Sequence, residues 1–128
     1  MILRVYRAKI NPTRLEAYRR FEAKECLPML HRQPRLLGVL FLRQAEDREA
    51  SLTIWEDRGT VEALASSPSF RRTTRELEEG DLLAAEPSVE VFEVEGGALR
   101  LEALTRTLDR TRRPGSSGLP VSGPETEE

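Results

Sequence analysis

Few side chains in this 128-residue chain are of the types that carry chemistry. His31 is the only histidine and Cys26 the only cysteine. On chemical grounds His31 is the obvious general base, because its ordinary pKa lies near neutrality. Its position beside Arg32, at the end of a predicted helix, instead favours a solvated residue that interacts with the helix C-terminus. One histidine and one cysteine exclude an internal disulfide and the common metal sites, so we expect no bound metal.

Tyr6 and Arg4 form a second group with chemical potential, on a strand predicted over residues 1–10. Side chains two residues apart on a strand share a face. If that face points inward, the pair offers a phenol and a guanidinium to a ligand. A surface tyrosine is the alternative.

Glu22 lies inside the apolar arc of the next predicted helix, four residues after Tyr18. Residues at this spacing are neighbours on one face of a helix. We expect Glu22 to pair with an arginine, and a working carboxylate is the alternative.

Trp55, the only tryptophan, ends a strand predicted over residues 52–55. Alternation puts Thr53 and Trp55 on one face and the aliphatic pair Leu52 and Ile54 on the other. The aliphatic pair is the better match for a layer of helices. Trp55 then faces a barrel interior or a subunit interface, where its indole N–H needs a partner. Pocket lining and simple packing both remain open.

The elements that position these residues follow from apolar periodicity, helix caps and breakers. Pro28 should kink or split the first helix, because proline lacks a backbone donor. The segment 36–43 is almost continuously apolar, which is typical of a strand with two dry faces. The sequence predicts strands over residues 1–10, 36–43, 52–55 and 88–94, and helices over 11–33, 57–66, 67–79 and 98–113.

This β-α-β-β-α-β order predicts an α+β, ferredoxin-like fold whose four-stranded antiparallel sheet carries its helices on one face. Both strand faces are apolar, since Val39 and Phe41 point one way and Leu40 and Leu42 the other. Leaving one such face in water would forgo roughly 10 kcal/mol. A second copy of the sheet is the simplest cover, so we expect a homodimer that encloses a hollow as a dimeric α+β barrel.

Composition divides the chain into three parts. Residues 1–96 form the predicted ferredoxin-like domain, and residues 97–113 an appended amphipathic helix with leucines at helical spacing. A partly ordered basic tail is the alternative for this second part. Residues 114–128 are rich in Pro, Gly and Ser and end in acidic residues, which is typical of a flexible tail.

The overall charge narrows the classes of partner. The chain has 20 Lys and Arg against 22 Asp and Glu, so it lacks the basic excess of a nucleic-acid-binding protein. It has no apolar run of the length of a membrane span, so we expect no membrane partner. Arg4 and Arg7 interrupt the N-terminal apolar stretch where a secretory signal would be continuous, so we expect a cytoplasmic protein.

The stretch "LTIWED", followed by a short helix, "SPSF" and a charged helix, resembles the antibiotic biosynthesis monooxygenase family. The passage from "LPML" into "QPRLLGVLFLR" and the helix start at Asn11-Pro12 support the resemblance, which spans residues 1 to 95. The resemblance implies small α+β proteins that form dimeric barrels. Some members oxygenate phenolic or quinol-type substrates with O₂ and without metal or flavin. That chemistry needs a dry cavity, a base or acceptor, and donors for developing oxyanion charge.

Haem-degrading members of the same family resemble the chain around Trp55, but they use an Asn on the first strand and a His on the second helix. The only Asn here is Asn11, beyond the strand, and Thr74 corresponds to the histidine. An axial nitrogen ligand is therefore missing, which makes haem degradation the weaker reading. Thr74 either lines the cavity or lies on the helix surface.

The resemblance implies an oxygenase that needs no cofactor and binds a small apolar or aromatic molecule. The residues predicted to bind the substrate are Trp55, Tyr6, Phe41 and Thr74, and no catalytic residue is assigned. The alternative is a non-catalytic dimer that binds a ligand or regulates a partner. The lack of Asn and His in the predicted pocket favours this alternative, and the identity of the substrate stays open.

Overall fold

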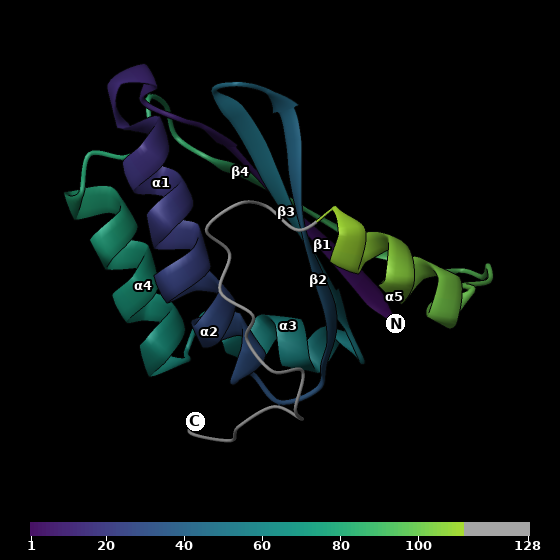
Figure 1. Ribbon diagram of the computed structural model, residues 1–128. Coiled ribbons are helices and arrows are strands. Elements are labelled where there is room, and N and C mark those ends of the chain that lie inside the picture. The colour runs from purple at the N-terminus through teal and green to yellow at the C-terminus, as the bar shows by residue number, and fades with distance from the viewer. Residues whose placement is uncertain (112–128) are drawn as a thin grey trace.

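A computed structural model describes residues 1–111, in which four strands form one antiparallel sheet with the order β2-β3-β1-β4 (Figure 1). This arrangement confirms the predicted ferredoxin-like α+β class. The predicted tail over residues 114–128 lies outside the described residues. The strands are β1 (Ile2–Lys9), β2 (Leu36–Ala45), β3 (Arg48–Trp55) and β4 (Ser88–Glu93).

The first helical segment changes its winding along its length. It runs through a 3-10 turn η1 (Pro12–Arg14), α1 (Leu15–Phe21), a π-helical turn η2 (Glu22–Cys26) and α2 (Leu27–His31). Pro28 cannot donate a backbone hydrogen bond to the preceding turn, and its ring crowds the carbonyl four residues earlier. The wider π turn directly before α2 accommodates that crowding, so the predicted kink at Pro28 takes this form. Such turns are rare in proteins, and those that occur often lie at functional sites.

The later helices begin and end at the predicted signals. Asp57 caps α3 (Arg58–Leu64) by accepting a hydrogen bond from the Thr60 N–H at 2.8 Å. Ser67 caps α4 (Pro68–Glu79) by accepting from the Phe70 N–H at 3.2 Å. Each cap satisfies a backbone donor that the first turn leaves free.

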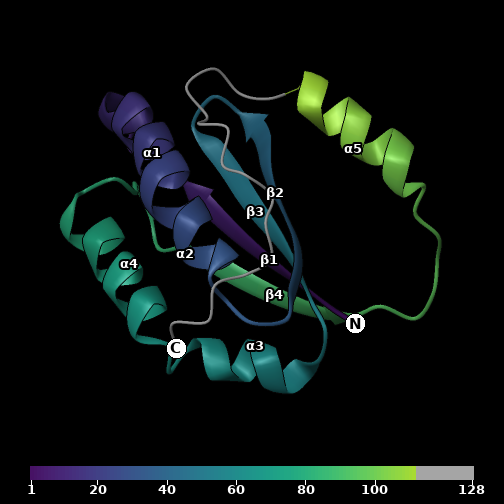
Figure 2. The same cartoon turned by 60° about the horizontal axis from the view of Figure 1, so that its bottom comes forward.

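One face of the sheet is covered by α1, α2 and α4 (Figure 2). The register pairs Arg4 with Thr53 and Tyr6 with Ser51, so these four side chains share that face. Trp55 lies on the same face and packs with residues of α2 and α3. The expectation that Leu52 and Ile54 face the helices is therefore wrong. The helix side of β3 carries its aromatic and hydroxyl residues instead.

Two apolar clusters fill the space between the sheet and the helices. One holds Trp55 with residues of β1, α2 and α3, and the other holds Tyr18 with residues of β1, α4 and the segment that follows α4. The buried members of the first cluster are Ile2, Met29, Leu30, Trp55 and Leu64. The buried members of the second are Ala8, Ile10, Tyr18, Leu77 and Leu82.

The opposite face of the sheet, which we call the open face, keeps apolar side chains at the surface. Leu42 is 40% exposed and Phe92 is 48% exposed. Their register partners, Ala50 on β3 and Leu3 on β1, extend the same apolar surface. The sequence predicts that both faces of β2 are buried. Within residues 1–111 only the helix side is covered well, and the open face is covered in part.

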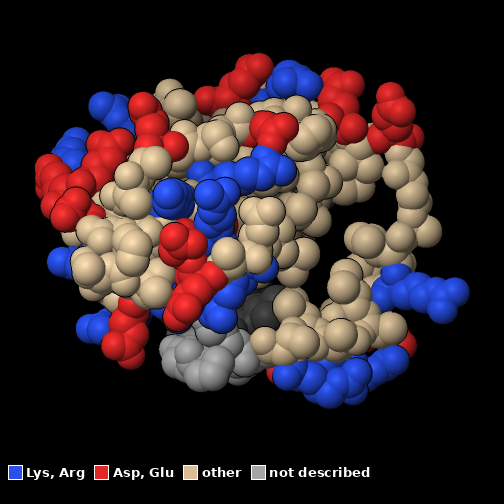
Figure 3. Space-filling view, turned by 90° about the horizontal axis from the view of Figure 1, so that it is seen from above, with Lys and Arg blue, Asp and Glu red and all other residues tan. Residues whose placement is uncertain are grey.

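Helix α5 (Leu101–Arg110) stands on the side of the open face, across the sheet from α1 and α4 (Figures 1 and 2). It lies inside the stretch 97–113, where the sequence predicts an appended helix. Its three leucines stay exposed. Figure 3 shows uncharged side chains on the inner side of this arm, Lys and Arg on its outer side, and a gap between the arm and the body. Among residues 1–111, no helix is long and apolar enough to cross a bilayer.

Candidate functional site

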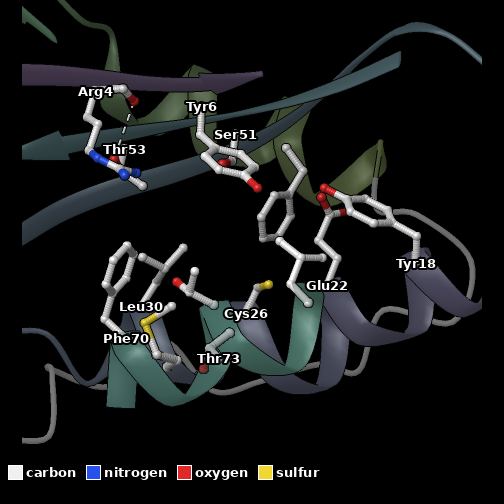
Figure 4. A pocket seen from close by; sticks show the side chains of 14 residues that line it. Arg4, Tyr6, Tyr18, Glu22, Cys26, Leu30, Ser51, Thr53, Phe70 and Thr73 are labelled. Carbon is white, nitrogen blue, oxygen red and sulfur yellow. Dashed lines mark hydrogen bonds between the residues drawn. The ribbon is translucent and has the colours of Figure 1, made fainter. Parts of the chain in front are cut away.

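A pocket with a cavity of about 70 Å³ lies between the sheet and the helices of the same chain (Figure 4). It sits where the two apolar clusters meet, because Leu30 of the first cluster and Tyr18 of the second both line it. This pocket lies within one chain, under α1, η2, α2 and α4, on the face opposite to the one where the sequence predicts a hollow between two sheets. Its sheet side is made by Arg4, Tyr6, Phe41, Ser51 and Thr53.

The floor of the pocket is fixed by a short relay of hydrogen bonds. Trp55 Nε1 donates to Thr53 Oγ1 at 2.7 Å, and Thr53 Oγ1 donates to the backbone carbonyl of Arg4 at 3.3 Å. Trp55 is fully buried, so its N–H needs this partner. The relay ties β3 to β1 at the point from which the Arg4 side chain enters the pocket.

Arg4 and Phe70 form one end of the pocket (Figure 4). The Arg4 guanidinium lies over the Phe70 ring, with 5.6 Å between its central carbon and the ring centroid. Burial lowers the pKa of Arg4, and the nearby Tyr6 phenol offsets that effect in part. Within residues 1–111, no carboxylate forms an ion pair with Arg4. The cation is held in the pocket by packing and by the aromatic ring.

Glu22 and Tyr18 form the other end, where η2 meets α1, and Cys26, at the α2 end of η2, lies nearer the middle of the pocket (Figure 4). Glu22 is only 2% exposed. Its charge adds to the effect of burial in raising the pKa of the Tyr18 phenol and of the Cys26 thiol, which reaches about 12. At neutral pH the tyrosine and the thiol are therefore protonated. The π turn places Glu22 and Cys26, at its two ends, on the side that faces the sheet.

Tyr6 lies between the two ends and points toward the helices (Figure 4). Burial raises the pKa of Tyr6 to about 12, and Cys26 and Glu78 add to the shift while Arg4 opposes it. Tyr6 is therefore a neutral phenol that can donate one hydrogen bond and accept others. It gives the middle of the cavity a polar group between two apolar clusters.

The structure separates the four residues that the sequence predicts for the substrate. Tyr6, Phe41 and Thr74 all line this pocket. Trp55 does not line it, because the ring is buried in the first apolar cluster and reaches the pocket only through Thr53.

The sequence gives only a weak signal, or none, for the other residues that line the pocket. Cys26, Ser51 and Thr53 line the pocket without a pattern that marks them as functional. Arg4 follows from strand alternation with Tyr6, once it is known which face carries the helices. His31 is in the last turn of α2 and does not line the pocket. Among residues 1–111, no group of three or more His, Cys, Asp and Glu could hold a metal ion.

A second hollow of about 440 Å³ lies at the hairpin end of the sheet. Arg7, Lys9, Arg43 and Arg48 contribute to its walls together with Glu49. The four cations are exposed, and the Glu49 carboxylate is used by Arg19, whose Nε lies 3.4 Å from Glu49 Oε2. This hollow is lined by exposed cations, so the pocket between the sheet and the helices is the stronger candidate for a binding site.

Comparison with known proteins identifies the fold. No family model and no curated protein matches the chain. It is similar to NE2512, a protein of unknown function from Nitrosomonas europaea, with a TM-score of 0.65 at 16% identity over 77% of this chain and 92% of that chain. It is also similar to SnoaB, a cofactor-independent oxygenase from Streptomyces nogalater, with a TM-score of 0.57 at 18% identity over 75% of this chain and 94% of that one.

A solved antibiotic biosynthesis monooxygenase has a TM-score of 0.58 at 14% identity, over 75% of this chain and all of that chain. These likenesses confirm the fold that the sequence resemblance implies. They cover almost all of the solved proteins but about three quarters of this chain. The chain is therefore longer than the shared fold.

Proposed function

We propose that this protein is a cofactor-independent oxygenase of the antibiotic biosynthesis monooxygenase type, which oxidises a phenolic or quinol-like substrate with O₂ in the pocket. One observation carries the proposal. The pocket has a guanidinium at one end and a buried carboxylate at the other, in a fold that includes a cofactor-independent oxygenase. A positive group that stabilises an oxyanion and a group that accepts a proton are what this chemistry asks of a protein.

The proposed reaction takes all of its electrons from the substrate. A phenolate oxygen on Arg4 makes the ring electron-rich, and O₂ forms a C–O bond at the para carbon, which faces Glu22. The proton on that carbon passes to Glu22 as the O–O bond breaks, and the departing oxygen leaves as water after taking up two protons, one from Glu22 and the one that the phenol lost on becoming a phenolate. One phenol and one O₂ thus give one quinone and one water.

The size of the pocket sets the scale of the substrate. A cavity of about 70 Å³ is less than half of the roughly 150 Å³ in which a protein interior takes up benzene. A single ring therefore enters only if half-buried lining side chains, such as Phe41 and Phe70, move aside. We propose a substrate with one aromatic ring rather than several fused rings.

A second copy of the chain is proposed to cover the open face. Leu42 and Phe92 lie on that face and are exposed, and α5, whose three leucines are also exposed, stands on the same side of the sheet (Figures 1 and 3). Covering these apolar side chains would recover about 25 cal/mol for each Å² removed from water. The dimer would leave the pocket on the far side of each sheet, so each subunit would hold one complete site.

Oxygen uptake tests the proposal directly. Purified protein with single-ring phenols that carry a hydrogen para to the hydroxyl should consume O₂ in amounts equal to the quinone formed, both without and with a metal chelator. The Glu22→Gln variant should lose at least about tenfold in rate, because general base catalysis contributes on the order of 10²–10⁴-fold. The exposed Glu62→Gln variant serves as the matched control. No protein-dependent uptake with any of these compounds would sink the proposal.

The second candidate function is a non-catalytic module that binds a small ligand. The small volume of the cavity favours it, because O₂ and a ring must share the space during oxygenation. Saturable binding of phenols without O₂ uptake would support this function. Release of quinone in step with O₂ uptake would exclude it.

A further inference from the structure

We infer that the pocket selects its ligand as an anion, with a carboxylate or phenolate oxygen on the Arg4 guanidinium and an aromatic ring beside Phe70. The inference rests on the proposed function only in placing the ligand in this pocket. It adds a chemical class, namely a single-ring aromatic compound that carries an anionic oxygen. The same site would bind such a compound whether or not it reacts with O₂.

The state of Arg4 is the main observation. Arg4 is half-buried, and charges that are partly removed from water are normally paired, because taking a cation out of water without an anionic partner is costly. Other arginines have carboxylate partners, since Arg35 pairs with Asp57 at the surface and Arg19 pairs with the buried Glu49. Arg4 lies in the pocket and has no carboxylate partner within residues 1–111. An anionic oxygen from a ligand would supply the missing charge.

The surroundings of Arg4 match a flat ligand. The guanidinium is held over the face of Phe70 at 5.6 Å, so its edge is left to form hydrogen bonds. Arginine presents its donors in a planar fork that fits a carboxylate with two parallel bonds. The Thr53 bond to the Arg4 carbonyl fixes the backbone from which this fork extends. Phe70 and Tyr6 then offer ring faces or edges to the aromatic part of the ligand.

The opposite end of the pocket fixes the direction of the ligand. Glu22 is buried there, and its carboxylate would repel a second anion at that end. A ligand therefore binds with its anionic oxygen at Arg4 and a neutral or proton-donating group toward Glu22. The 4-hydroxybenzoate ion has this polarity, with a carboxylate at one end of a ring and a hydroxyl at the other.

A matched pair of ligands tests the inference by calorimetry, under nitrogen and at constant ionic strength. The wild-type protein should bind 4-hydroxybenzoate at least about tenfold more tightly than neutral 4-hydroxybenzamide, since hydrogen bonds from Arg to a charged acceptor are stronger than those to a neutral one. Arg4→Gln should remove this preference, and Arg4→Lys should keep part of it. Arg7→Gln is the control, because Arg7 is on the same strand but exposed and paired with Glu90 on the other face. It should change neither affinity by more than about twofold.

A chromophoric phenol separates the two sources of the anionic oxygen. Near the pKa of free 4-nitrophenol, binding should raise the phenolate absorbance in the wild type and not in Arg4→Gln. If the protein prefers 4-hydroxybenzoate over the amide but does not raise the phenolate absorbance, the site binds carboxylates. If it raises the phenolate absorbance but does not prefer 4-hydroxybenzoate, the site binds phenolates. Either result supports the inference. Equal binding of acid and amide together with no rise, or effects that survive in a folded Arg4→Gln protein, would overturn it.

The outcomes also distinguish this inference from the proposed function. Binding that prefers the anion and depends on Arg4, without any O₂ uptake, would leave the anion site standing and remove the oxygenase. Turnover of neutral phenols at the same rate in the wild type and in Arg4→Gln would support the oxygenase and remove the anion site.

Discussion

The indole N–H of Trp55 donates a 2.7 Å hydrogen bond to Thr53 Oγ1, two residues earlier on the same strand. Side chains at this spacing share one strand face, so the largest buried ring of the protein supports a hydroxyl that lines the pocket. Thr53 in turn donates to the Arg4 carbonyl at 3.3 Å. A core residue thus helps to hold the strand that carries the cationic end of the site.

Thr53→Val should lower the free energy of unfolding by about 1–3 kcal/mol, because it keeps the shape of the side chain but leaves the buried Trp55 N–H without its acceptor. Urea denaturation followed by tryptophan fluorescence gives the value. Thr53→Ser retains the hydroxyl and should lose less. If the valine variant were as stable as the wild type, the hydrogen-bond relay would have no energetic role.

The two tyrosines of the chain, Tyr6 and Tyr18, both line the pocket, so their titration reports on the site alone. The pKa of Tyr6 rises from 10.0 to about 12 in the folded protein, mainly through burial. The folded state therefore favours the protonated phenol. Its contribution to stability is complete below pH 10 and is lost as the pH rises from 10 to 12.

The measurement for this prediction is unfolding by urea at several pH values, with tyrosinate absorbance recorded in parallel. Stability should fall above pH 10, and Tyr6→Phe should flatten the slope. Tyrosinate should form at a higher pH in folded protein than in urea. Ionisation of both tyrosines near pH 10 while the protein stays folded would contradict the enclosed pocket.

Cys26 gives a second reporter, as the only cysteine of the chain. Burial, helped by Glu22, Glu25 and Glu76, raises the pKa of its thiol from 9.0 to about 12. Since the thiolate is the reactive form, alkylation by iodoacetamide at pH 8 should be at least about 100-fold slower in folded than in unfolded protein. Phenolic ligands should slow it further by filling the pocket. Equal rates in both states would place Cys26 at the surface.

Phe41→Ala should widen the pocket from its sheet side, because the Phe41 ring is part of the lining. The affinity for 1-naphthol relative to phenol should rise about tenfold, while the free energy of unfolding falls by less than the roughly 3–5 kcal/mol of a fully buried phenylalanine. Leu37→Ala, on an exposed site of the same strand, is the control. A ratio of affinities that stays unchanged would mean that Phe41 does not restrict ligand size.

Phe92→Arg should weaken the proposed dimer by at least about tenfold, because it replaces an apolar ring on the open face with a charge. Sedimentation of wild type and variant over a range of micromolar concentrations measures the effect. Glu62→Arg, on exposed α3 surface, is the control and should not change association. A wild-type chain that sediments as a monomer at all these concentrations would rule out the dimer.

Local signals in the sequence predicted the elements well. The caps at Asp57 and Ser67, the breaker at Gln33-Pro34 and strand alternation all act within a few residues, and the structure confirms the elements that they begin or end. The side of β3 that faces the helices could not be predicted in this way. Alternation yields two sets of side chains, and the aliphatic Leu52 and Ile54 looked more suited to a core.

The choice between these sets depends on partners that are distant in sequence. Trp55 and Thr53 are accommodated under the helices because the Arg4 carbonyl completes their hydrogen bonds. Glu49, on the same strand, is buried with Arg19 of α1. Periodicity contains no information on these pairings. The pocket could therefore be predicted only in part, through Tyr6, Phe41 and Thr74.

The π turn also accounts for one residue of this helix. The Leu27 N–H reaches the Glu22 carbonyl five residues earlier, one residue further than in a regular helix, so the segment takes up an extra residue between α1 and α2. Glu22 and Cys26, at the two ends of the turn, both line the pocket at this spacing. A one-residue deletion there should return the turn to regular winding and change the spacing of these two side chains, so it should alter the pocket more than a substitution of Lys24 or Glu25.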